Sequence, residues 1–289
     1  MMQKKKWMYN LFVVSVTELA ILYLGFMAIN SVFDNAFYPL IAGVLDPQRF
    51  EFWYWAGLTV LYLIPSAAVL LYIRATDREV LTRLAPRKGA GRALLLGSVA
   101  GAGMNLLCVL LAAATGSFAL TFSGFTPLVL PLVVFCFFTC ACEELLCRGY
   151  ALEYLKKRYP IEVAAATGSV LFFFHHVNNL VAYGFNPWFA LNVFLIGLLF
   201  VLITELTGSI WAAFGMHTLW NYTQQFVLGL PNSGASSSLS VFTGEGAVSG
   251  FFFDTAFGLE GAPGTTLVIL IALAVLFALY VRRRAAAQA

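Results

Sequence analysis

Carboxylates and imidazoles occur inside hydrophobic stretches of this chain, in patterns that could do acid–base chemistry. The three segments are Glu-Glu-Leu-Leu-Cys-Arg at 143–148, Phe-Phe-Phe-His-His at 172–176 and His-Thr-Leu-Trp-Asn at 217–221. Ionisable side chains are costly within a bilayer, and those found there usually face a protein interior or a water-filled cavity and serve a function. The segments therefore predict a membrane-embedded site, and specifically a membrane enzyme.

The elements that must position these residues are hydrophobic helices. The chain has 289 residues, of which 61% are hydrophobic and only 11% are charged, whereas a soluble domain has about 25% charged residues. The apolar runs are long and continuous, which argues against the alternating pattern of a β-barrel. We therefore predict an all-α membrane protein in which residues 1–289 form a single polytopic domain.

About 20 consecutive apolar residues are needed to cross a bilayer as a helix. By this measure we predict eight transmembrane helices, at residues 10–32, 52–73, 92–115, 128–157, 161–183, 187–206, 209–229 and 264–281.

The basic residues predict the orientation of these helices. They cluster at 4–6, 74–92, 156–158 and 282–284, which all fall on one side if there are eight spans. Lys and Arg are enriched in cytoplasmic loops, so we expect both termini in the cytoplasm.

The length of the chain and its lack of a transit-peptide pattern favour a bacterial plasma membrane. The Gly- and Ser-rich residues 232–250, within a 231–263 connection, predict a flexible external loop.

A turn at Pro160 would bring the first two motifs to the same depth. Glu143 lies 17 residues before this proline and His176 lies 16 residues after it. Two antiparallel helices with equal rise would place both side chains ~24 Å from the turn, facing each other. A carboxylate beside an imidazole in a low-dielectric pocket can activate water, with the carboxylate as general base.

Two further pairs share a helix face because their members are four residues apart. Glu144 can pair with Arg148, which would leave Glu143 free on a neighbouring face. His217 and Asn221 can aim N–H groups at one point, as an oxyanion hole does during acyl transfer. A base, its partner and two donors are what amide hydrolysis requires.

In this order and spacing, the three motifs resemble those of the CPBP family. That family groups the type II CAAX prenyl endopeptidases with bacteriocin-processing (Abi) and bacteriocin-immunity membrane proteins. The resemblance covers residues 128–225, which would be the catalytic core. Two positions depart from the pattern: Cys147 stands where an aromatic residue is common, and His175 is an additional histidine.

The resemblance implies an intramembrane glutamic endopeptidase with an eight-helix core and no required cofactor. Its substrates would be lipidated or hydrophobic peptides or membrane-protein segments, reached through a gap toward the cytoplasmic leaflet. The partners expected are this substrate and the lipid bilayer, and no nucleic acid. Carried across, the roles of water activator (Glu143, His176), oxyanion hole (His217, Asn221) and support (Glu144, Arg148, Phe172) fall on the motif residues.

Other functions remain open from the sequence. The chain could be a non-catalytic membrane scaffold or immunity protein, or a proton-coupled transporter that uses Glu143 and the histidines as a relay. It could also bind zinc through Glu143, His176 and His217, although it has no HExxH helix. A continuous helix would turn His175 ~100° away from His176, so we expect His175 to be a packing or interface residue. Glu18 is expected to be protonated or paired within the bundle.

Overall fold

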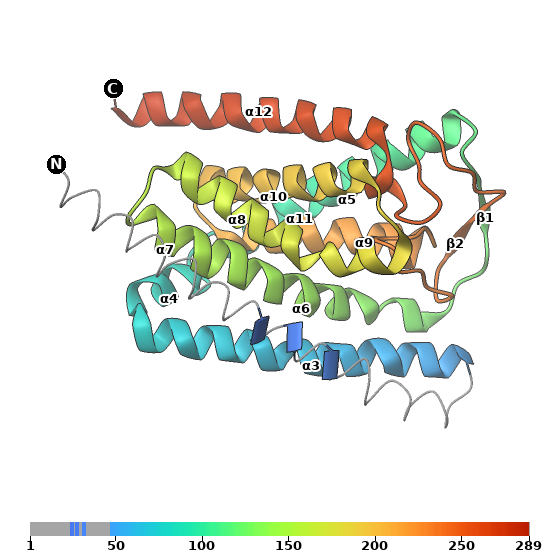
Figure 1. Ribbon diagram of the computed structural model, residues 1–289, viewed down its shortest axis with the longest axis horizontal. Coiled ribbons are helices and arrows are strands. Elements are labelled where there is room, and N and C mark those ends of the chain that lie inside the picture. The colour runs from blue at the N-terminus through green and yellow to red at the C-terminus, as the bar shows by residue number, and fades with distance from the viewer. Residues whose placement is uncertain (1–23, 26, 29–30, 33–46, 289) are drawn as a thin grey trace.

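The computed structural model describes residues 24–25, 27–28, 31–32 and 47–288, and within them the chain forms a bundle of long helices (Figure 1). Most of the predicted first span and Glu18 lie outside the described residues. The elements in chain order are α3 (Pro47–Thr76), α4 (Arg78–Leu84), α5 (Ala90–Ala114), β1 (Ala119–Phe122), η2 (Pro127–Val129), α6 (Leu132–Glu144), η3 (Leu145–Ala151), α7 (Leu152–Lys156), α8 (Ile161–His175), α9 (Val177–Tyr183), α10 (Pro187–Thr207), α11 (Ile210–Tyr222), η4 (Thr223–Val227), β2 (Phe242–Glu245), η5 (Leu259–Gly261) and α12 (Pro263–Gln288).

Five helical stretches within the described residues are long and apolar enough to cross a membrane. They are Glu51–Thr76, Ala90–Ala114, Pro127–Lys156, Pro187–Thr207 and Pro263–Ala286. Each corresponds closely to a span predicted from hydropathy, so a mostly helical membrane protein is confirmed, while the count of eight spans stays a prediction.

Two predicted spans are interrupted. The span expected at 161–183 is divided into α8 and α9, because His176 leaves the helical conformation with φ −99° and ψ 2°. The span expected at 209–229 consists of α11 followed by the π-helical segment η4. A second π-helical segment, η3, interrupts the helix that continues from α6 into α7. Such segments are rare and frequently occur at functional sites.

Close packing of α5 against α11 fixes the helix that carries the third motif. A Cβ atom at Gly97 would lie 1.9 Å from the backbone oxygen of Ala212, and one at Gly101 would lie 2.1 Å from that of Met216. Small residues of this kind allow two helix backbones to approach closely in a membrane. The position of α11 in the bundle therefore depends on these glycines.

The end of the bundle that holds α4 and α7 is joined by ion pairs. Lys157 Nζ lies 2.6 Å from Asp77 Oδ2, and Arg83 NH1 lies 2.8 Å from Glu153 Oε2. Burial by itself would raise the pKa of Asp77, but hydrogen bonds from Lys157 and from the Val80 backbone N–H bring this pKa below its ordinary value. We call this end, which carries residues 74–92, 156–158 and 282–284, the basic end.

The opposite end is closed by a folded connection, where the sequence predicted a flexible loop. Strand β2 pairs antiparallel with β1, with Phe242 opposite Phe122. Leu230, Phe253 and Leu259 are buried in a cluster that also contains residues of α5. The Gly- and Ser-rich composition did not predict this packing, because the apolar residues that hold the connection in place are scattered between the glycines and serines.

Candidate active site

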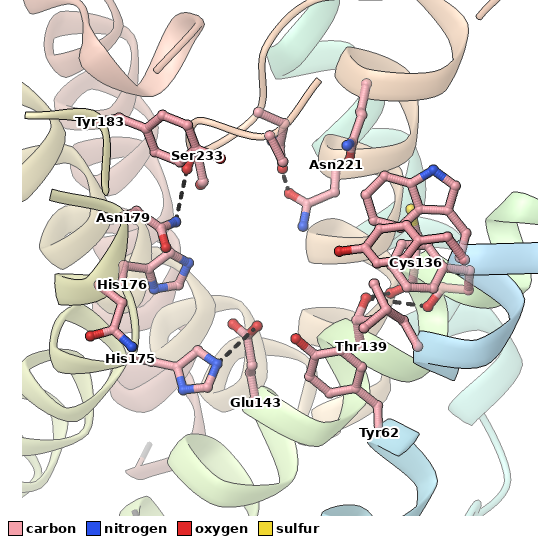
Figure 2. A pocket seen from close by; sticks show the side chains of 18 of the residues that line it. Tyr62, Cys136, Thr139, Glu143, His175, His176, Asn179, Tyr183, Asn221 and Ser233 are labelled. Carbon is pink, nitrogen blue, oxygen red and sulfur yellow. Dashed lines mark hydrogen bonds and ion pairs between the residues drawn. The ribbon is translucent and has the colours of Figure 1, made fainter. Parts of the chain in front are cut away.

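A cavity of about 330 Å³ lies between α3, α6, the α8–α9 break and the end of α11, with residues of the 228–262 connection at its rim (Figure 2). Such a volume is near the lower end of the range for ligand pockets. The residues around it come from the first and second motifs, from the end of the third, and from segments that no motif marks. The described lining residues that matter chemically are Tyr62, Glu143, His175, His176, Asn178, Asn179, Asn221, Gln225 and Asn232.

Glu143 is in the last turn of α6, immediately before η3. Its side chain is 13% exposed, and its Oε1 lies 3.4 Å from Nε2 of His175, an ion pair when this imidazole is protonated. The other oxygen, Oε2, is buried and has no hydrogen-bond partner among the described residues. This oxygen therefore has an unused capacity to accept a hydrogen bond.

His175 and His176 both line the cavity with Glu143. For His175, this position was not expected from the sequence. The expected 100° separation holds only within a continuous helix, and α8 ends at His175. The contact to Glu143 comes from His175, and His176 lines the same cavity (Figure 2). The expected orientation of His175 away from this site is therefore wrong, while its role stays a prediction.

The hydrogen bond of His176 determines which of its nitrogens carries the proton in the neutral ring. Its Nδ1 lies 2.9 Å from the backbone oxygen of Phe172. A carbonyl oxygen can only accept, so Nδ1 must donate, and Nε2 of the neutral imidazole is then a proton acceptor. His176 thus offers the cavity a second basic atom beside the carboxylate.

The Glu144–Arg148 ion pair expected from the i,i+4 spacing is present and fully buried. Arg148 NH1 lies 3.0 Å from Glu144 Oε1, and both side chains have no exposed surface. Arg148 NH2 also donates to the backbone oxygen of Gly197 at 2.9 Å, and its guanidinium lies 4.4 Å from the ring centroid of Phe172. Arg148 therefore connects η3 to α10 and to the second motif.

His217 belongs to this buried cluster and is not among the described residues that line the cavity. Its Nδ1 lies 3.0 Å from Glu144 Oε1. A carboxylate accepts, so Nδ1 carries a proton, and Nε2 would donate as well only if the imidazole were cationic. Of the four residues predicted to be catalytic, Glu143, His176 and Asn221 line one cavity. The fourth, His217, hydrogen-bonds Glu144 outside it.

Asn221 is held by residues that the sequence did not identify. Its Nδ2 lies 3.5 Å from Cys140 Sγ, and its Oδ1 accepts a hydrogen bond of 3.3 Å from Asn232 Nδ2. Asn232 Nδ2 also donates to Glu260 Oε1 at 2.9 Å. The 228–262 connection is thereby tied to the third motif.

Glu260 is the buried centre of this attachment. Its carboxyl accepts from Trp220 Nε1 at 2.7 Å and from Gln224 Nε2 at 3.0 Å, in addition to Asn232. Burial raises the pKa of Glu260, against the opposing effect of these hydrogen bonds. The sequence contains one indication of this buried carboxyl, a single acidic residue in the apolar segment 257–262. Its hydrogen-bond partners lie up to 40 residues away in the chain, so they could not be identified from the sequence.

The described residues contain no group of three or more His, Cys, Asp or Glu side chains arranged to hold a metal ion. The acidic and imidazole groups are instead divided between the cavity and the buried Glu144 cluster.

A comparison with protein families supports the assignment of the three motifs. Residues 125–223 match the family of type II CAAX prenyl endopeptidases, Rce1-like. The matched segment contains all three motifs, so the resemblance to the CPBP family is confirmed, while α3, α5 and α12 lie outside it. No curated protein and no solved structure matches the chain. The match and the five apolar helices together support a peptidase in a membrane.

Proposed function

We propose that this protein is an intramembrane endopeptidase in which Glu143 activates a water molecule for attack on a peptide bond. The main support for this proposal is that Glu143 Oε2 is buried and has no hydrogen-bond partner among the described residues. The Glu143 side chain lines the cavity. A buried acceptor of this kind needs a polar partner. A bound water would provide one and would be held next to His176.

The proposed reaction begins when Glu143 accepts a proton from this water as its oxygen bonds to the carbonyl carbon of the substrate. The C–N bond then breaks, and the same proton passes from Glu143 to the leaving nitrogen. The products are a carboxylic acid and an amine, and the Glu143 carboxylate is regenerated. Nε2 of His176 is a second acceptor that can orient the water, and His175 fixes the opposite oxygen of Glu143.

Asn221 is the proposed donor to the oxyanion of the tetrahedral intermediate. Its amide nitrogen lies at the cavity, next to Cys140, whose thiol is a poor competitor for a hydrogen bond. Loss of one such donor lowers kcat by about 100- to 1000-fold. His217 hydrogen-bonds Glu144 and does not line the cavity among the described residues, so we propose that it supports the Glu144 cluster behind the site.

The proposed substrates are hydrophobic or lipidated peptides and membrane-protein segments. The family description names prenyl endopeptidases, and several aromatic side chains line the cavity, including Tyr54, Trp55 and Phe135. We further propose that no metal takes part. Cleavage is then expected to persist in the presence of chelators, and loss of activity that zinc restores would support a metallopeptidase instead.

The proposal is tested by comparing peptide fragments in membranes from cells that produce the wild type, Glu143→Gln or Glu245→Gln at equal levels. Glu245 is an exposed carboxylate at the end of β2 and is the matched control. We expect new peptide termini in the wild type and in Glu245→Gln, and their absence in Glu143→Gln. Fragments that are unchanged in Glu143→Gln would refute hydrolysis by this residue, whereas a binding or immunity role would survive the substitution.

A further inference from the structure

The two ends of the bundle differ strongly in basic charge. Lys and Arg occur at 74–92, 156–158 and 282–284, all at the basic end, whereas the connections 115–131, 184–186 and 228–262 contain neither. Arg49, near the start of α3, is the one basic residue at the opposite end within the chain from 47 onward. Figure 1 shows β1 and β2 at the end opposite α4 and α7. Because positive charge is retained on the cytoplasmic side, we infer that this end faces away from the cytoplasm.

The cavity belongs to this second end. Asn232, Ser233 and Ala235 of the 228–262 connection line it. Of the four residues of α3 that line it, Tyr54, Trp55 and Leu58 lie in the half of that helix remote from the basic end, and Tyr62 lies just past the middle. Glu143 is 13 residues before Lys156, the last residue of α7, which is about 20 Å along the helix axis. The carboxylate is thus deep in the bundle and is connected through the cavity to the non-basic end.

The basic end has a cavity of its own that stops short of Glu143. This space of about 250 Å³ is lined by Arg83, Arg87, Lys156 and, at its inner part, Arg148. The two cavities share no lining residue. The fully buried Glu144–Arg148 pair follows Glu143 in the chain, on the side of the basic end. A substrate that came from the cytoplasm would have to pass this desolvated ion pair to reach Glu143.

The lining of the Glu143 cavity is suited to the backbone of a peptide. It contains five carboxamides and, among the described residues, no Lys or Arg that could neutralise a terminal carboxylate. One carboxamide, Gln225, is 4% exposed, and its Nε2 has no hydrogen-bond partner among the described residues. A buried N–H donor without a partner is costly unless a ligand or water satisfies it. The five are Asn178, Asn179, Asn221, Gln225 and Asn232.

We propose that the substrate enters from the extracytoplasmic face, and that the cavity binds an uncharged internal segment of an exported peptide or of an external part of a membrane protein. Gln225 Nε2 donates to a backbone carbonyl of this segment. The cleavage of the segment rests on the proposed function, whereas the side of entry does not. This direction is opposite to the opening toward the cytoplasmic leaflet that the sequence led us to expect.

The side of entry is tested by labelling engineered cysteines with a membrane-impermeant charged maleimide. The variants are Ala235→Cys and Asn178→Cys in the cavity and Lys88→Cys at the basic end, each combined with Cys136→Ala to remove the native thiol that lines the cavity. We expect the two cavity cysteines to react in right-side-out vesicles and the Lys88→Cys protein to react in inverted vesicles. Reaction of the cavity cysteines in inverted vesicles alone would overturn the proposal.

The substrate class is tested by mapping the Glu143-dependent cleavage sites. We expect them within exported peptides or extracytoplasmic segments, away from the chain termini, and we expect Gln225→Leu to raise KM for such a peptide roughly 2- to 10-fold with kcat largely retained. Glu143-dependent sites on the cytoplasmic side would overturn the proposal while the peptidase function stands. Labelling from the outside without any Glu143-dependent cleavage would support the entry route and refute the peptidase function.

Discussion

Replacing Arg148 by Met tests whether the buried Glu144–Arg148 pair is an essential part of the framework behind the site. The substitution retains an apolar side chain of similar length against Phe172. It removes the charge and the hydrogen bonds to Glu144 and to the backbone oxygen of Gly197. Glu144 would be left as a desolvated carboxylate with His217 as its hydrogen-bond partner among the described residues.

The expected loss of stability is large because both side chains have no exposed surface. Removing one member of a buried ion pair costs about 3–5 kcal/mol, or roughly two to four orders of magnitude in the unfolding equilibrium. The chain offers a matched control in Arg83, which pairs with Glu79 at the same i,i+4 spacing but with 45% and 60% of the two side chains exposed. Arg83 also pairs with Glu153, which keeps Lys156 as a partner when Arg83 is replaced. Arg83→Met should have a much smaller effect, as is usual for exposed pairs.

The assay is unfolding of the purified protein in mild detergent by a denaturing detergent, followed by circular dichroism. A double variant, Glu144→Gln with Arg148→Met, should be less destabilised than Arg148→Met alone, because it leaves no unpaired charge. The reasoning would be refuted if Arg148→Met and Arg83→Met lost similar amounts of stability, or if the double variant were the sum of the two single changes.

Three further predictions concern other parts of the bundle. Gly101→Ala should cost about 1–3 kcal/mol because a Cβ there meets the backbone of α11, while Gly103→Ala, which has nothing within 4 Å, should be close to neutral in the same unfolding assay. Glu260→Gln should lower stability by about 1–3 kcal/mol, because its amide N–H group opposes the donors that now bond the carboxyl; wild-type stability would contradict this. Because Lys157 lowers the pKa of Asp77, this pair should stabilise the protein above pH ~4 and lose its effect as the pH falls further. The stability difference between the wild type and Asp77→Asn should therefore shrink in acid, and a constant difference down to pH 3 would contradict the assignment.

The sequence was sufficient to predict the parts of the fold that depend on local hydropathy and spacing. The apolar helices α3, α5, α6, α10 and α12 follow from runs of about 20 apolar residues, and the Glu144–Arg148 pair follows from its i,i+4 spacing. The resemblance to the CPBP family was also evident from three motifs in order, and the match of residues 125–223 confirms that resemblance.

The features that the sequence did not predict depend on contacts between distant segments. The helix break at His176 accompanies a hydrogen bond to the Phe172 backbone, and it brings His175 to Glu143 against the expectation for a continuous helix. The attachment of the 228–262 connection requires Glu260 to meet Trp220, 40 residues earlier. Helical periodicity has no means of showing either arrangement, because both are decided by tertiary contacts.

The short spacing within the first motif also has a consequence for how the chain is made. Acidic and basic side chains oppose the transfer of a nascent helix from the translocon into lipid, by about 2.5–3.5 kcal/mol each at the centre of the helix. Gly197 and His217, which contact the motif in the finished protein, are synthesised after it. Because Glu144 and Arg148 lie on one helical turn, they can neutralise each other as soon as that turn forms. The segment thus carries its own counter-ion during insertion, before the later helices arrive to enclose it.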